Sequence, residues 1–145
     1  MAFESRLVLC LSIVMSGCGV FTKPPPTQSK IDGLTRMVYP RDAGYSENLD
    51  ITVRWQGDTL TLVNLTPRRY ERMHMWLNQQ YVSKVEEIRI GVDNRLELQR
   101  FINRHGESFP LGAFLQPDKS FPVVLAELFD PASGQRYRLF VDRTP

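Results

Sequence analysis

Two runs of alternating apolar and polar residues constrain the fold of this chain more than any other feature. The runs cover residues 49–55 and 59–65, and Gln56-Gly57-Asp58 separates them. Alternation with a period of two is typical of a half-buried strand, and a short glycine-containing break between two such runs is typical of a hairpin. The sequence therefore predicts an antiparallel hairpin over residues 49–65, with Trp55 on its core face.

A second hairpin is predicted near the C-terminus. Residues 121–129 are apolar, and residues 136–141 alternate between arginine or phenylalanine and apolar positions. Between them, Asp130 and Pro131 suit a type I turn, and Gly134 can adopt a positive φ.

The segment 69–82 fits two interpretations. As a strand it places Met73, Met75 and Leu77 on one face; as a helix it aligns Met73 and Leu77 with Tyr70 and Tyr81. Its aromatic residues favour a strand, and its flanks carry no capping box. We therefore predict a strand here, with the helix as the alternative.

These segments predict an all-β protein. Six to eight short strands at regular intervals are typical of a single small antiparallel β-sandwich of immunoglobulin-like type, which we assign to residues 31–145. The spacing of Leu98, Phe101 and Ile102 leaves room for at most one or two short helical turns, with Gly106 as a stop.

The N-terminus has the pattern of a secretory signal. Arg6 is followed by the mostly apolar run 7–15 and then by Ser16-Gly17-Cys18. The run is too short to cross a bilayer, which takes roughly 20 helical residues. We expect residues 1–17 to be a signal peptide. An ordinary secreted protein cut near Gly17, or an uncleaved anchor, is the alternative.

Ser16-Gly17-Cys18 resembles the lipobox of bacterial lipoproteins, with Met15 at a position where leucine is usual. The resemblance implies cleavage before Cys18 and a diacylglyceryl group on its sulfur, so that the lipid bilayer is the first partner. It also implies a bacterial cell-envelope location, facing the periplasm or the exterior. Gly19 favours the outer membrane over the inner membrane.

Residues 18–30 then form the lipidated cysteine and a flexible, proline-rich tether, because residues 23–30 contain three consecutive prolines and almost no apolar side chain. Cleavage before Cys18 removes Cys10, the only other cysteine, so the mature chain has no disulfide.

The segments Trp55-Gln56-Gly57-Asp58-Thr59-Leu60, Asn64-Leu65-Thr66 and Trp76-Leu77-Asn78 resemble those of a group of small bacterial lipoproteins. The strand plan is also similar to the immunoglobulin-like or FxLYD-type sandwiches of envelope proteins. The resemblance spans about residues 48–142. It implies a fold and a compartment, and no catalytic residues.

Charge and motifs favour a non-catalytic protein. The net charge of +2 does not indicate a nucleic-acid partner, and we interpret the basic group at residues 68–72 as a solvated loop rather than an anion site. His74 and His105 are not spaced as zinc ligands, and Glu107 beside His105 suits a surface turn, so we expect no metal and no cofactor. Glu86 and Glu87 face opposite sides of a strand, and the sequence contains no nucleophile motif.

The candidate binding residues are Trp76, Asn78 and Gln80. In a strand, Trp76 is out of phase with Met75 and Leu77, so it lies on the opposite face and is the better aromatic candidate for an exposed contact. The expected function is a protein-interaction or assembly accessory that meets an unknown envelope protein or glycan. A carbohydrate or peptidoglycan-binding module is the alternative, and a small hydrolase a minor one.

Overall fold

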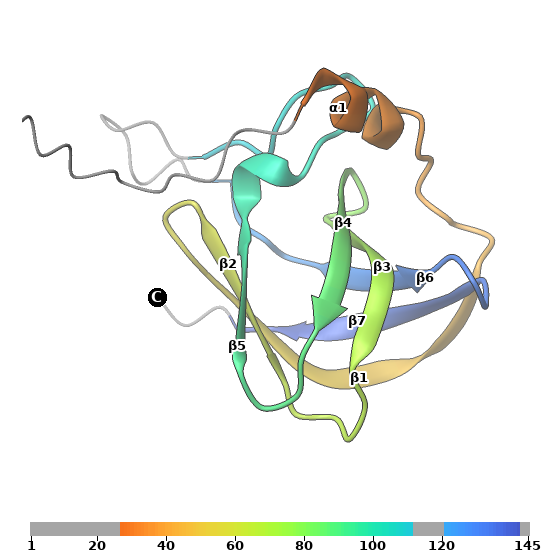
Figure 1. Cartoon of the computed structure of the whole chain (residues 1–145), viewed down its shortest axis with the longest axis vertical. Coiled ribbons are helices and arrows are strands. Elements are labelled where there is room, and N and C mark those ends of the chain that lie inside the picture. Colours follow the sequence, from red (N-terminus) through yellow and green to blue (C-terminus); the bar gives the residue numbers. More distant parts are fainter. Residues whose placement is uncertain (1–26, 112–120, 143–145) are drawn as a thin grey trace, which may run out of the picture.

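The computed structural model describes residues 27–111 and 121–142. The predicted signal peptide, Cys18 and most of the predicted tether lie outside them. A helix, α1 (Gln28–Thr35), precedes a seven-stranded sheet in the order β4-β3-β6-β7-β1-β2-β5 (Figure 1). The strands are β1 (Gly44–Gln56), β2 (Thr59–Asn64), β3 (Tyr70–Leu77), β4 (Tyr81–Ile88), β5 (Asp93–Glu97), β6 (Ala126–Asp130) and β7 (Gln135–Val141). The sheet curls into a nearly closed, barrel-like sandwich, which confirms the all-β prediction.

Both predicted hairpins are present. Strands β1 and β2 pair antiparallel around Gly57, which has a φ of 59°. Strands β6 and β7 pair antiparallel around Gly134, which has a φ of 69°. In both turns glycine occupies the left-handed region that a residue with a side chain enters only at a cost.

Segment 69–82 is a strand, as predicted, but it also contains a turn that the sequence did not reveal. Strand β3 ends at Leu77, and β4 begins at Tyr81. Leu77 pairs with Tyr81 across the turn. Asn78 and Gln79 have φ values of 51° and 60°. Consecutive residues with positive φ form the turn whose twist matches a hairpin.

Two features of the chain path correct the predictions. Strand β1 pairs with β7 in parallel, with register shifts between Tyr45 and Asn48 and between Leu49 and Thr52, so the sheet is mixed rather than antiparallel throughout. Residues 28–35, expected as the end of the tether and the start of the strands, form α1. The predicted helical turn near Leu98 is the 3₁₀ turn η1 (Leu98–Arg100).

Two apolar clusters stabilise the fold. The larger one fills the inside of the curled sheet and includes Met73, Met75 and Leu77 from β3. Trp55 continues the face of Ile51 and Val53 as predicted, but it lies near the end of β1 and is only half-buried. The smaller cluster lies on the outer face of β3 and β4, where α1 covers it with Leu34 and Ile31.

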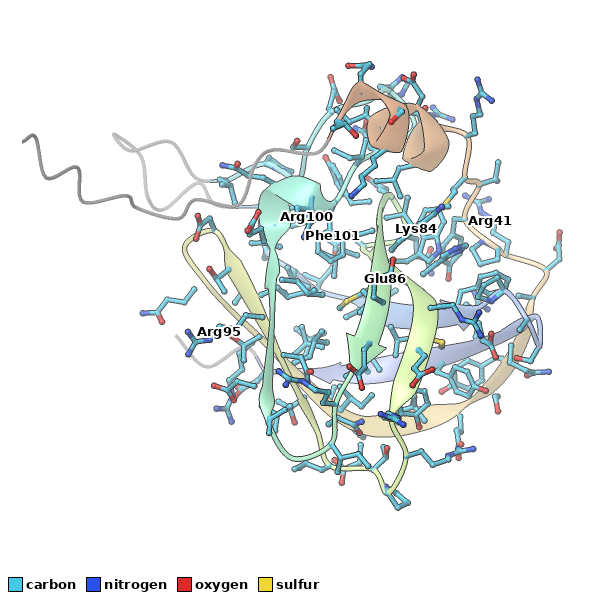
Figure 2. All side chains as sticks on the ribbon, viewed as in Figure 1. Arg41, Lys84, Glu86, Arg95, Arg100 and Phe101 are labelled. Carbon is cyan, nitrogen blue, oxygen red and sulfur yellow. The ribbon has the colours of Figure 1, made fainter. Side chains whose placement is uncertain are left out.

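The edge strands of the sheet, β4 and β5, do not pair with each other, but hydrogen bonds of residues in or next to them connect the two edges at two points. At one, the backbones of Val82 and Ile102 exchange two hydrogen bonds of 3.0 Å. At the other, the buried Asn94 amide accepts from the backbone N–H of Arg89 at 2.9 Å and donates to its carbonyl oxygen at 2.9 Å. Lys84 and Glu86, labelled in Figure 2, lie on β4 between these points.

Asn64 joins β2 to the end of β4 and the loop before β3. Its fully buried amide donates to the carbonyl oxygens of Arg68 (2.8 Å) and Ile88 (3.4 Å) and accepts from the backbone N–H and hydroxyl of Thr66.

Asn64→Ala is therefore expected to lower the free energy of unfolding by about 1–3 kcal/mol, because it leaves buried backbone groups unpaired. Urea denaturation measures the change. The exposed Gln56→Ala is the control and should shift stability by less than about 0.5 kcal/mol. Equal effects of the two substitutions would contradict the assigned role of Asn64.

Candidate functional site

A groove with a volume of about 1040 Å³ lies beside α1. One wall is the linker between α1 and β1, residues 36–43, of which 37–43 line the groove. The opposite side combines Gln79 and Gln80 of the β3–β4 turn with the loop 103–105, and Trp76 and Ile102 are among the apolar residues at the base. The linker contributes Val38, an apolar side chain that is 85% exposed. The groove is thus open, and both apolar and polar groups line it.

The base of the groove is built on Trp76. Register with Val82 and with Glu127 places Trp76 on the outer face of the sheet, opposite Met75, as predicted. However, Trp76 is only 3% exposed, which contradicts the expected exposed contact. The ring of Tyr39 packs edge-on against the indole, with 5.4 Å between ring centroids. Trp76 therefore supports the groove and offers no stacking platform.

Tyr39, Glu127 and Arg136 form a polar cluster, the Tyr39 cluster, that attaches the linker to the outer face of β6 and β7. The Tyr39 hydroxyl donates to Glu127 Oε2 at 2.6 Å, and Arg136 donates to the same hydroxyl oxygen. The Arg136 guanidinium also lies over the Tyr39 ring, 5.3 Å from its centroid. Because Glu127 is 1% exposed, this carboxylate depends on the other two side chains for compensation.

Burial, together with the hydrogen bond to Glu127, raises the pKa of Tyr39 above its ordinary value. The hydroxyl therefore remains protonated and acts as the donor to Glu127. On the same face, burial and the nearby charge of Lys84 lower the pKa of His74, which is half-buried as predicted. Neutral His74 packs against Phe129, with 6.0 Å between ring centroids.

The three candidate binding residues do not form one surface. Trp76 is buried, and the Asn78 side chain holds residues 122–125 in place. Asn78 donates to the carbonyl oxygen of Pro122 at 2.8 Å and accepts from the backbone N–H groups of Val124 and Leu125. Gln80 is exposed and lines the groove. The groove also includes the linker, whose role sequence reasoning missed because no periodic signal marks residues 36–43.

The other predicted positions behave as surface groups. In the loop 103–107, the Asn103 side chain accepts from the backbone N–H groups of His105 and Glu107, which makes this segment a turn. Arg69 pairs with Glu71 at 3.1 Å and Glu87 at 3.3 Å, as a solvated loop would. Within residues 27–111 and 121–142, no three His, Cys, Asp or Glu side chains group as metal ligands.

None of the helices in the described part of the chain is long and apolar enough to cross a membrane. Comparisons with protein-family models, with curated proteins and with solved structures found no match for this chain.

Proposed function

We propose that this chain is a non-catalytic bacterial envelope lipoprotein, anchored through a diacylglyceryl group on Cys18, that acts as a protein-interaction or assembly accessory. The observation that carries the proposal is the groove beside α1. It is long enough to involve three separate segments, and its mixture of apolar and amide side chains suits a protein segment of a partner.

The position of the groove suits a partner at the membrane surface. The residues from Gly19 to Thr27 connect the proposed anchor to the start of α1. Fully extended, these residues span roughly 30 Å at most. Since Thr35 of α1 borders the groove, an anchored chain would hold the groove near the bilayer, with the outer membrane favoured by Gly19.

The two alternatives have less support. A carbohydrate or peptidoglycan-binding module would stack sugar rings on an exposed aromatic side chain, and Trp76 is buried. A small hydrolase would need His105 beside a nucleophile and an orienting acid. His105 instead accepts a hydrogen bond from Arg104 Nε at 3.1 Å.

The anchor is tested by Cys18→Ser. We expect this variant to move from the detergent phase to the aqueous phase on detergent partition, and to lose radiolabelled palmitate, because the lipid chains supply the stable attachment. Cys10→Ser, within the signal segment, is the matched control and should remain in the detergent phase. Unchanged partition of Cys18→Ser would show that the sulfur carries no anchor.

The interaction role is tested by in-situ photocrosslinking. A photoreactive residue at Val38, in the groove, should crosslink to one defined envelope protein in the native membrane. The same residue at Phe140, which is 52% exposed on β7 and does not line the groove, is the control and should give no such product. Crosslinks to glycan alone, or equal protein crosslinks from both positions, would contradict the proposal.

A further inference from the structure

The groove carries positive charge that the chain itself does not neutralise. Arg41 lies on the linker, as Figure 2 shows, and Arg104 lies on the facing loop. Across the described ranges 27–111 and 121–142, neither guanidinium forms an ion pair, whereas Arg54 pairs with Asp142 at 3.0 Å. Asp42 is the single acidic side chain among the described residues that line the groove. Two cations therefore face this space with one carboxylate.

A hydrogen bond, and no ion pair with a described residue, orients the Arg104 side chain. Its Nε donates to Nε2 of His105, and the backbone of the loop is fixed by the Asn103 side chain. The terminal guanidinium nitrogens of Arg104 form no hydrogen bond or ion pair with the described residues and remain available for a carboxylate. A guanidinium that is already oriented loses less side-chain freedom when it binds an anion.

The groove also contains a hydrogen-bond donor without an acceptor. The indole Nε1 of Trp76 is buried, and no residue of the described ranges accepts its hydrogen bond. Orphaned buried donors are rare in folded proteins and call for an explanation. A protein segment bound in the groove carries carbonyl oxygens that can accept this hydrogen bond, and a change in the indole resonance would report the contact.

We propose that the groove binds an acidic, extended segment of a partner protein, whose carboxylates pair with Arg41 and Arg104. This inference rests on the proposed function and names the chemistry of the partner. An extended segment brings carboxylates to both sides of an open groove, offers backbone groups to the Gln79 and Gln80 amides, and places its own apolar side chains against Val38 and Met37. A single small anion would make no use of the apolar side chains of the groove.

The test uses the full chain as isolated, in a zwitterionic detergent. The probe is a fluorescein-labelled peptide of alternating glutamate and glycine, and its matched control replaces glutamate by glutamine. We expect the glutamate peptide to bind about tenfold more tightly or better, with affinity falling as salt is raised. Arg41→Glu and Arg104→Glu should each weaken it by about tenfold or more, because each substitution reverses a charge in the groove.

Arg89→Glu is the control variant, because Arg89 is exposed and lies outside the groove. It should leave the affinity within about twofold. The indole resonance of Trp76 in a ¹⁵N spectrum should shift when the glutamate peptide binds. Trp55→Phe, which removes the other indole, identifies this resonance. Equal affinity for the two peptides, no binding of either, or an equal loss with Arg89→Glu would overturn the inference. If Val38 still crosslinks to one envelope protein, the proposed function stands and only the acidic nature of the partner fails.

Discussion

A variant in which Glu127 is replaced by leucine is expected to lose about 3–5 kcal/mol of its free energy of unfolding. The substitution removes the acceptor of the Tyr39 hydroxyl and the carboxylate that faces Arg136. Arg136 is then left with 16% exposure of its side chain and no counter-charge. Its Nε is already 3.9 Å from Glu127 Oε1, too far for a hydrogen bond, so the cluster has no spare partner. Urea denaturation measures the loss.

Two further variants distinguish the effect of an unpaired buried charge from the effect of losing a charge at the surface. Glu47→Leu removes an exposed ion pair with Arg68, at 3.6 Å, and should cost less than about 1 kcal/mol. Glu127→Leu combined with Arg136→Met removes both charges and should be more stable than Glu127→Leu alone, since no unpaired cation remains. A double variant as unstable as the single one would show that the charge pairing is not the cause.

Trp76→Ala is expected to lower the free energy of unfolding by about 3–5 kcal/mol, because it removes the largest side chain of the smaller apolar cluster and leaves a cavity there. The loss should also be local. Leu34 belongs to this cluster, and Ile31 and Tyr39 pack against it, so α1 and the linker of the variant should exchange their amide hydrogens faster than the sheet. Hydrogen exchange followed by mass spectrometry measures this difference.

Phe140→Ala is the control for the removal of an aromatic ring, because Phe140 is 52% exposed. It should change stability by less than about 1 kcal/mol. The assignment of Trp76 to the contact between sheet and helix would be wrong if Trp76→Ala left the exchange of residues 28–43 unchanged.

The parts of the fold that follow from local pattern could be predicted. Residues 49–65 alternate with a period of two around a turn with glycine, and an apolar run ending at Phe129 is followed by a turn with glycine and the alternating residues 136–141; both segments form hairpins. The phase of Trp76 against Met75 and Leu77 also gave its face correctly. These features depend on residues that are close together in the sequence, so the sequence pattern alone can predict them.

The remaining features depend on contacts between distant segments. Ile31 and Leu34 are the large apolar side chains of α1, and the helix has no side-chain cap, so its sequence signal is weak, and packing against the sheet stabilises it. The turn at Asn78 lacks glycine; the Asn78 side chain stabilises it by hydrogen bonds to residues 122–125. The burial of Trp76 was missed for the same reason, because the linker that covers it comes from residues 36–43.

The position of β7 has a consequence for how the protein is made. Among the described residues it is the last strand in sequence, yet in the sheet it joins β4-β3-β6 to β1-β2-β5. A chain that leaves a ribosome or a secretion channel from its N-terminus therefore cannot complete its hydrogen-bonded sheet until residues 135–141 have emerged. Until then the two ladders that β7 forms with β6 and with β1 are missing, and the two groups of strands are connected only by the hydrogen bonds near β4, β2 and β5. A product shortened by ten residues at its C-terminus should accordingly be a substrate for proteases rather than a smaller folded domain.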